Sequence, residues 1–443
     1  MKKRYITGMM VLLTTALAAT GCENATTGGS GSNGNAGSTA QPQASQTVSS
    51  APVTLTVFQN GAEITDDDFK LLFADPVKKK YPNIDLKIVR QDANTTLDSL
   101  IASGNVPDLL LTPNSGIMGL KQQDLLYDMS SLVKKYNIDL SRFNSVAIDA
   151  VKSDKGELWG LPYALQFNAL YYNKDIFNKF GISYPKDGMT WDDAIQLGQQ
   201  LTRKDGDIQY RGLDPASSYV VSFPYSLTYV DGKTNKASMD NDQWRKVFDL
   251  TKRILTIPGN MQPSPEPSAA ASGSLFIKDK NVAMLASTNL MAQMGSASNE
   301  VNWDIAQYPS FQDKPNISGK VDSHNIMIAK TSKHQDDAMK VIEVVTSDDV
   351  QLLSARKTAR MSPLNNDEMK KQFGADVPYL KGKNVQALFK STVSPTPIYS
   401  IYETDGKRIG QQKFRDFLAD KIDMNTALRQ ADEEINKKID SMK

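Results

Sequence analysis

An alternation of strand-like and helix-like stretches restricts the possible fold more than any other feature of this chain. Polar and apolar residues alternate over 53–58, a helix opens at Thr65, a second strand covers 84–88 and a short helix covers 95–102. Leu109–Leu111 is an unbroken apolar run, which is typical of a parallel strand covered on both faces. The order β-α-β-α-β predicts an α/β fold with an open sheet.

Size and composition narrow the class of protein. From Val53 to Lys443 the chain is too long for one ordinary domain and suits two or three. Its 51 lysines and arginines balance its 50 aspartates and glutamates, so the net charge does not indicate nucleic-acid binding. Cys22 is the only cysteine, which excludes disulfides and thiolate metal sites. We expect no metal and no cofactor.

The N-terminus has the features of a bacterial secretion signal. A positively charged start precedes an apolar run over 9–19, which is too short to span a bilayer stably, and Cys22 follows. The sequence Ala-Thr-Gly-Cys ending at Cys22 resembles the lipobox of bacterial lipoproteins, although Ala19 stands where leucine is usual. In that motif the cysteine takes a diacylglyceryl group and becomes the new N-terminus. We therefore predict a signal peptide at 1–21, a lipidated Cys22 and a location on the outer face of the cell membrane.

The segment 22–52 has the composition of a flexible linker. It consists almost entirely of small and polar residues and has no apolar periodicity, so it cannot bury a core. Gly29, Gly31 and Gly34 match the spacing of a dinucleotide-binding loop, but no strand precedes them and no helix follows. We interpret the segment as a tether between the membrane surface and a folded body.

Two loops of the predicted sheet are candidate ligand contacts. Ligands of open α/β sheets bind outside the carboxyl ends of the strands. Here that edge carries Gln59–Gly61 and Thr112–Asn114, so Asn60 and Asn114 are candidates, although asparagine and glycine also simply form turns. We interpret Asp66–Asp68 as the charged start of a helix rather than a metal site.

Helical periodicity recurs along the rest of the chain. Apolar residues within 125–136, 244–255 and 428–442 fall on one helical face in each case. Capping boxes are predicted at Thr190–Asp193 and at Ser332–Gln335. We expect the C-terminal helix to pack on the body to which it belongs.

A series of short blocks occurs in an order that resembles a known family. The blocks are Ser103–Asp108, Gly156–Tyr163, Leu170–Phe177, Met189–Asp193, Phe276 with Lys280–Met284, Trp303–Pro309 and Lys333–Val345. Their order is similar to that in extracellular solute-binding proteins of ABC importers, in particular sugar- and oligosaccharide-binding lipoproteins. The resemblance covers nearly all of the mature chain and depends on the ordered set rather than on any single motif.

The resemblance implies two α/β lobes joined by several crossovers, with the ligand enclosed between them. We place one lobe at 53–163 plus 311–350 and the other at 164–310 plus 351–443. Hinge closure on a small solute would create the surface that an ABC permease recognises. We also expect a monomer that binds no nucleic acid and contacts the membrane only through its lipid.

Aromatic and planar polar residues are the candidate ligand contacts, because sugars present C–H faces and hydroxyl groups. The candidates for stacking are Phe167, Tyr225, Tyr229 and Tyr399, and those for hydrogen bonding are Asn60, Asn114, Gln166, Asn289, Asp322, His324 and Arg360. Relatives carry a tryptophan close to Asn289, where this chain has asparagine and leucine. Each aromatic residue also has an alternative role in ordinary core packing.

Two other functions remain open on the sequence alone. A lipid-anchored hydrolase would need an active site, but the chain has two histidines and neither a Gly-x-Ser-x-Gly nor a His-Glu-x-x-His motif. Carboxylate pairs for glycoside cleavage need only spatial proximity, so the sequence does not address them. A surface protein of the same fold could instead act as a sensor partner or an adhesin. We expect a binding protein rather than an enzyme.

Overall fold

The computed structural model describes residues 51–92, 94–261, 269–298 and 300–443. The predicted signal peptide, Cys22 and nearly all of the predicted tether lie outside these residues. The chain separates into two units, residues 1–49 and residues 50–443, and the description below concerns the second. Within the described ranges, no helix combines the length and the apolar character needed to cross a membrane.

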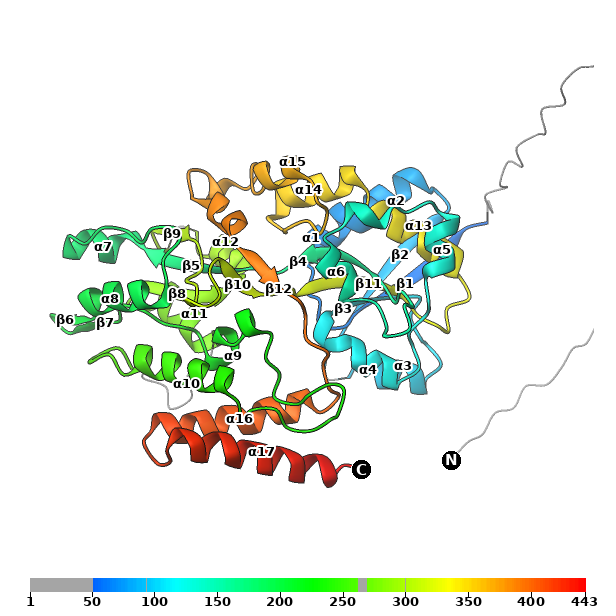
Figure 1. Ribbon diagram of the computed structural model, residues 1–443. Helices are drawn as coiled ribbons and strands as arrows, with labels where there is room; N and C mark the ends of the chain where they lie inside the picture. The colour runs from blue at the N-terminus through cyan, green and yellow to red at the C-terminus, as the bar shows by residue number, and fades with distance from the viewer. Residues whose placement is uncertain (1–50, 93, 262–268, 299) are drawn as a thin grey trace, which may run out of the picture. The chain divides into compact units, whose positions relative to one another are not determined.

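A five-stranded mixed sheet forms the centre of the first half of the fold (Figure 1). Its strand order is β2 (Ile84–Arg90), β1 (Val53–Gln59), β3 (Leu109–Pro113), β11 (Ser323–Ile328) and β4 (Leu161–Leu165). β1 pairs in parallel with both β2 and β3, whereas β11 runs antiparallel to β3 and β4. The predicted β-α-β-α-β order with an open α/β sheet is therefore confirmed.

Helices cover both faces of this sheet, with α2, α13 and α14 on one side and α3 and α4 on the other (Figure 1). The helical elements are α1 (Asp66–Phe69), the π-helical turn Lys70–Ala74, α2 (Asp75–Lys80), α3 (Leu97–Ala102), α4 (Ile117–Gln122), α5 (Ser130–Lys135), α6 (Ser145–Asp149), α13 (Gln335–Val345), α14 (Asp348–Thr358) and α15 (Asp367–Lys371), with 3₁₀ turns at Asn114–Gly116 and Leu140–Arg142. Thr65 caps α1 by accepting a hydrogen bond from the Asp68 N–H, and the three aspartates fill its first turn. The interpretation of Asp66–Asp68 as a helix start is confirmed.

The second half is built on a smaller antiparallel sheet, in the order β8 (Met284–Thr288), β5 (Asn168–Asn173) and β9 (Trp303–Ala306). Two short pairs accompany it, β10 (Ile317–Lys320) with β12 (Thr392–Ser394), and β6 (Arg203–Asp205) with β7 (Ile208–Tyr210). The helical elements here are α7 (Lys174–Phe180), α8 (Trp191–Leu201), α9 (Ser218–Val221), α10 (Asp242–Leu255), α11 (Ala269–Ile277), α12 (Met291–Ser296), α16 (Glu403–Leu418) and α17 (Met424–Asp440), with 3₁₀ turns at Phe223–Tyr225, Pro378–Leu380 and Val385–Lys390.

Each half has its own hydrophobic core, and the chain passes between the cores several times. β4 continues into β5 through Gln166 and Phe167, and β10 continues into β11 through Val321 and Asp322. A later crossing runs from Met369, in the first core, to Phe373, in the second. The fold is thus a two-lobe α/β fold joined by multiple crossovers.

Core membership departs from the expected lobe boundaries in two places. Phe311 belongs to the second core, and β10 pairs with β12, although 311–350 was expected in the first lobe. Ala355 and Leu364 belong to the first core, although 351–443 was expected in the second. The cause is that α14 and α15 follow α13 on the first sheet before the chain crosses back.

Two helix predictions are confirmed and two are wrong. The buried face of α10 and the capping box at the start of α8 form as predicted. The segment 125–136 is helical only within α5, because Asp124 adopts a left-handed conformation (φ 54°) and the chain then runs extended to Met129. The capping box at Ser332–Gln335 does not form, since the Ser332 hydroxyl donates to Asp108 instead.

The C-terminal helix packs on its own half of the molecule, as predicted. α17 lies against α16 and α10, and it buries Leu428, Ala431, Ile435 and Ile439 (Figure 1). Met442 was expected on the same face, but it follows the end of the helix and is 49% exposed.

Candidate functional site

A cavity of about 410 Å³ lies at the carboxyl ends of β1 and β3. The first half contributes Asn60, Gly61, Gln91, Pro113, Ser115, Gly116, Met118, Gly119 and Gln122, and the second half contributes Tyr219, Tyr399, Ser400, Ile401, Glu403, Thr404 and Lys407. The Asn60 side-chain amide donates to the Thr112 hydroxyl at 3.2 Å, which connects the loop after β1 to the end of β3. The position agrees with the loops expected from the sequence, and we call this cavity the cleft cavity.

Asn114 lies beneath this cavity rather than in its wall. Its side chain is buried, donates to the Val321 carbonyl at 3.2 Å, and accepts from Ser323 at 2.6 Å and from Asn325 at 3.0 Å. All of its nearest partners therefore belong to the crossing between β10 and β11 and to β11 itself. These bonds fix the end of β3 against the crossing, and the ligand contact expected of Asn114 stays a prediction.

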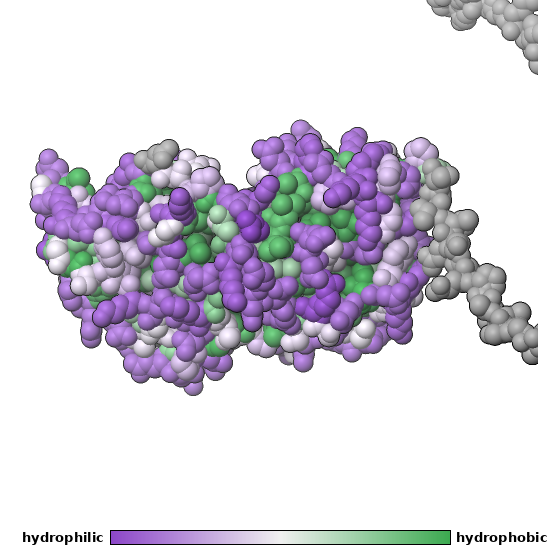
Figure 2. Space-filling view, turned by 90° about the horizontal axis from the view of Figure 1, so that it is seen from above, coloured by the Kyte–Doolittle hydropathy of each residue, from purple (hydrophilic) through white to green (hydrophobic). Residues whose placement is uncertain are grey.

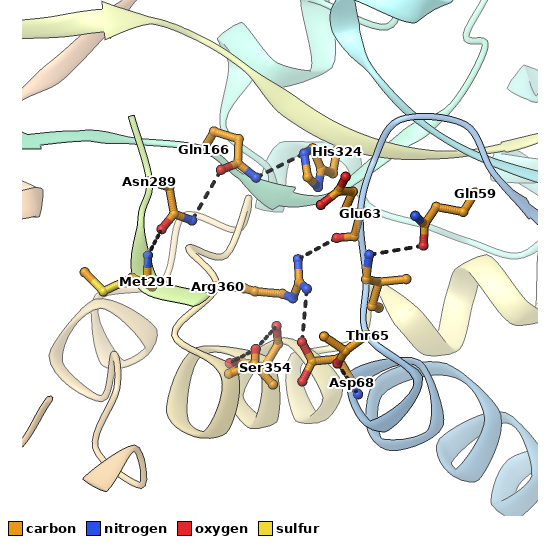
Figure 3. Close-up of polar contacts among 12 residues, drawn as sticks. Gln59, Glu63, Thr65, Asp68, Gln166, Asn289, Met291, His324, Ser354 and Arg360 are labelled. Atoms are coloured by element: carbon orange, nitrogen blue, oxygen red, sulfur yellow. Dashed lines mark hydrogen bonds and ion pairs between the residues drawn. The ribbon is translucent and has the colours of Figure 1, made fainter. Parts of the chain in front are cut away.

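Gln166, His324 and Asn289 form a polar chain between the two halves (Figure 3). The Gln166 side-chain nitrogen lies 3.0 Å from His324 Nε2, and the Gln166 oxygen accepts from Asn289 at 3.3 Å. Since the amide nitrogen donates to Nε2, the ring proton resides on Nδ1, which is buried without a partner among the described residues. Burial and the nearby Arg360 lower the pKa of His324 to about 4, so the ring is neutral at pH 7.

Arg360 connects the segment after α14 to the start of α1, and Figure 3 shows its guanidinium pointing toward Asp68 and Glu63. The guanidinium donates to Asp68 at 3.0 Å and to the Glu63 carbonyl at 3.4 Å. Its Nε is buried without a partner among the described residues. Arg360 is therefore held in place by the first half while it keeps one donor unused.

Tyr399 belongs to a charged cluster beside the cleft cavity, made of Lys320, Asp322, Glu403 and Lys407. Lys320 Nζ is buried without a hydrogen-bond partner among the described residues, and it lies 5.0 Å from the centre of the Tyr399 ring, 5.2 Å from that of Tyr219 and 4.4 Å from that of Phe223. Burial lowers the pKa of Lys320 to about 8, against the opposing effect of the carboxylates. Burial likewise raises the pKa of Glu403 to about 7 and raises that of Asp322.

Three predicted stacking residues lie elsewhere. Phe167 is buried against Phe373 and lines a different cavity. Tyr225 donates to Asp313 at 2.6 Å in a separate surface hollow that also contains Lys246. Tyr229 is fully buried against Trp244, because it fills the core beneath α10.

Sequence reasoning missed Lys320, Tyr219, Glu403 and Lys407. Lys320 had a usable signal, because it stands two residues before Asp322 on an extended segment, where alternate side chains point to the same side. Glu403 and Lys407 lie one helical turn apart on α16, but their approach to Tyr219 depends on how α16 packs. No local pattern predicts that packing.

The arrangement suits a small polar solute without net charge. Two lysines face two carboxylic acids in the cluster, while the cavity wall adds tyrosine rings and the amides of Asn60 and Gln91. The face seen from above, on the side of α14 and α15 rather than of α4 and α16, is also hollowed between the two halves, and apolar residues are visible on both sides of that hollow (Figure 2). Rings combined with planar polar groups are the composition of a pocket that orients a ligand.

Comparison with protein families gives a match over much of the chain. Residues 61–352 match the model for "bacterial extracellular solute-binding protein". Among curated relatives, the arabinooligosaccharide-binding protein of Bacillus subtilis (strain 168) is 28% identical over 204 residues, which are 42% of this chain and 46% of that protein. The diacetylchitobiose binding protein NgcE of Streptomyces coelicolor is 25% identical over 134 residues, 29% of this chain and 28% of that protein. The chain thus spans less than half the length of these curated relatives.

Solved structures resemble the fold over a longer range. An ABC substrate-binding protein from Listeria monocytogenes in complex with cycloalternan has a TM-score of 0.70 at 20% identity, covering 88% of this chain and 99% of that one. The cyclic alpha-maltosyl-1,6-maltose binding protein from Arthrobacter globiformis also has a TM-score of 0.70, at 16% identity, covering 87% of this chain and 99% of that one. At these identities the likeness establishes the two-lobe α/β architecture.

Proposed function

Because the chain belongs to the family of bacterial extracellular solute-binding proteins, we propose that it captures a sugar or oligosaccharide in the cleft cavity between its lobes. The observation that carries this proposal is the combination of Tyr219 and Tyr399 with uncharged amides and hydroxyls in one cavity of about 410 Å³. The relatives named above support it, since their names refer to oligosaccharides. Tyrosine rings would cover the C–H faces of a sugar, and the amides would bond its hydroxyls.

A neutral solute fits the site better than a charged one. Lys320 and Lys407 stand beside Asp322 and Glu403, so a ligand of either sign would meet repulsion as well as attraction. His324 stays neutral at pH 7 because burial holds its pKa near 4. Gln166 and Asn289 add amide groups on the other side of the crossing between β4 and β5, which extends the proposed site toward Arg360.

We assign one lobe to residues 53–165 plus 322–371 and the other to residues 166–321 plus 372–443. Closure of these lobes on the ligand would be a hinge motion at the crossings. In this proposal the closed form presents the surface that an ABC permease recognises, and the binding protein acts as a monomer. Delivery to the permease requires that the ligand bind the closed arrangement more tightly than the open one.

The proposed place of action is the outer face of the cell membrane. The positively charged start, the apolar run and the sequence Ala-Thr-Gly-Cys support cleavage before Cys22 and lipid attachment to it. The small and polar residues that follow would let the lobes reach a permease while the lipid stays in the bilayer.

A thermal-shift screen tests the ligand class. The unit of residues 50–443 would be heated with neutral mono- and oligosaccharides, with amino acids, peptides and polyamines as rivals. A ligand that binds only the native state raises the melting temperature in a saturable way. We expect such a shift with one class of neutral sugar. A shift with an amino acid, peptide or polyamine alone would keep the binding role and overturn the sugar assignment.

A further inference from the structure

A second cavity, of about 420 Å³, lies among the chain crossings and is separate from the cleft cavity. Its wall contains residues from all three crossings or their edges, including Leu165, Phe167, Val321, Met369 and Phe373. We call it the hinge cavity. It shares no lining residue with the cleft cavity, and its volume falls within the range of pockets that hold small molecules.

The two cavities lie on opposite sides of the crossing between β10 and β11. Val321 lines the hinge cavity, whereas Lys320 lies against Tyr219 and Tyr399, which line the cleft cavity. Successive side chains of an extended segment point to opposite sides, so this alternation is what the backbone requires. A molecule in the hinge cavity would therefore leave the cleft cavity free and would meet the proposed sugar site only at Gln166, which lines the hinge cavity and bonds His324 and Asn289.

The wall of the hinge cavity mixes aliphatic and polar side chains with three phenylalanines and two methionines. The Phe373 ring lies edge-on to both Phe167, with 6.0 Å between centroids, and Phe389, at 5.6 Å. Met361 and Met369 complete this part of the wall. Aromatic edges favour the face of another ring, and methionine side chains adapt to its outline.

Most polar side chains of the hinge cavity are already engaged in bonds within the protein. The side-chain oxygens of Asn144 and Asn366 accept from backbone N–H groups at the starts of α6 and α15. The Ser362 hydroxyl bonds Gln351, and Asn365 donates to the Phe143 carbonyl at 2.8 Å. Lys370, the charged residue of the lining, pairs with Asp367. The wall therefore offers apolar contact but little compensation for a charged ligand.

From these contacts we propose that the hinge cavity is a second binding site, which takes an uncharged molecule with one or two aromatic rings. Its wall draws on both cores, so its shape depends on the angle between them. A molecule that fits one arrangement best shifts the population toward it, and the effect on the cleft is reciprocal. Binding of an aromatic molecule in the hinge cavity does not depend on the sugar assignment, whereas the coupling to the cleft rests on the proposed function.

Binding of 2-naphthol, which is fluorescent and uncharged at neutral pH, tests the site. We expect the full chain to bind it with one site and a dissociation constant below about 1 mM. Val146→Phe places a ring in the cavity from α6 and should weaken binding about tenfold or more, because the ring occupies volume that the naphthol would fill. Val106→Phe, a half-buried valine outside the cavity lining, is the matched control and should leave binding unchanged.

A second variant protects the test against misfolding of the first. Thr392→Glu adds a carboxylate at an exposed position of the lining and should weaken 2-naphthol severalfold. The proposal is overturned if the wild-type protein does not bind 2-naphthol. It is also overturned if Val146→Phe and Thr392→Glu fold and bind 2-naphthol as tightly as the wild type. Simple competition with a cleft sugar overturns it as well. If a sugar that binds the cleft is found, saturating the protein with it should change the dissociation constant of 2-naphthol by about 5-fold or more, to a constant value. If no sugar binds, the proposed function falls while the naphthol titration still decides this site.

Discussion

Arg360 forms an ion pair with Asp68 at 3.0 Å, and this contact joins the segment after α14 to α1, 292 residues earlier. Both side chains are largely buried, at 16% and 24% exposure, so the pair is shielded from solvent more than the surface pairs of this protein. It lies where the chain turns toward the crossing at Met369–Phe373. The pair therefore holds one edge of the proposed site in a fixed position.

Replacing Arg360 by alanine should affect both stability and ligand binding. The change leaves Asp68 buried without its partner, so we expect the free energy of unfolding to fall by about 1–3 kcal/mol. Binding of the cleft sugar should weaken severalfold without loss of the fold, as measured by calorimetry. Arg356→Ala removes the more exposed pair with Asp376 and should destabilise the protein less than Arg360→Ala does. Equal affinity in Arg360→Ala and wild type would remove Arg360 from the proposed site.

Asn289→Ala tests the polar chain on the side of the second lobe. Asn289 donates to Gln166 at 3.3 Å and accepts from the Met291 N–H at 2.9 Å, so its loss frees the Gln166 amide and loosens the start of α12. We expect sugar affinity to fall about tenfold, as for one lost hydrogen bond, with a small change in melting temperature. Asn302→Ala, which removes an exposed bond to Asp175, is the control and should bind normally. If Asn289→Ala melts at a lower temperature than the wild type but binds the sugar equally well, Asn289 has a structural role only.

His324 should make the protein less stable in acid. Burial lowers its pKa in the folded state from 6.5 to about 4, so the unfolded chain takes up the proton first. The stabilisation is present above pH 6.5 and is lost as the pH falls through 4, and it amounts to about 3 kcal/mol. Urea unfolding of wild type and His324→Gln between pH 4 and pH 8 measures it. Parallel pH profiles of the two proteins would contradict the buried neutral ring.

Lys320 should make the free energy of unfolding depend on pH in the alkaline range. Burial lowers its pKa from 10.5 to about 8, so the stabilisation is complete above pH 10.5 and is lost as the pH falls through 8. Lys320→Met removes this dependence, and its free energy of unfolding relative to wild type should rise by about 3 kcal/mol between pH 10.5 and pH 7. Lys413→Met replaces a buried lysine that pairs with Glu434, and it should instead be less stable than wild type. A difference between Lys320→Met and wild type that does not vary with pH would mean that the ammonium is already well solvated.

Local periodicity predicts the strands and helices of this chain well where each element is continuous. β1, β2, β3 and the buried face of α10 follow from residue spacing alone, because alternation and the 3.6-residue repeat are set by the backbone. The segment 125–136 shows where this fails. Its apolar spacing fits a helix, but Asp124 in a left-handed conformation and a bridge from Leu126 to Ala329 hold its first part extended. Contacts from distant residues decided that conformation.

The candidate site was harder to predict than the fold. Asn60 and Tyr399 line the cleft cavity, and Gln166, Asn289 and His324 come together, while their contact with a ligand stays a prediction. Tyr225 and Tyr229 do not join them, because an aromatic residue near a cleft and one in a core look alike in sequence. Lys320 and Glu403 were missed because 83 residues separate them, and only the packing of α16 beside β10 brings their charges into range.

The alternation at Lys320, Val321 and Asp322 has a mechanical consequence. Three successive residues of one extended segment face two different cavities, so this segment cannot move to change the shape of one cavity without changing the shape of the other. The Val321 carbonyl is bonded by Asn114, its N–H bonds the Ser394 carbonyl, and the Asp322 carbonyl accepts from the Gln166 N–H, so this segment moves together with its neighbours on both sides. The segment would then couple the shapes of the two cavities. Substitutions that stiffen it should slow lobe movement in both directions while leaving the equilibrium affinity for the sugar almost unchanged.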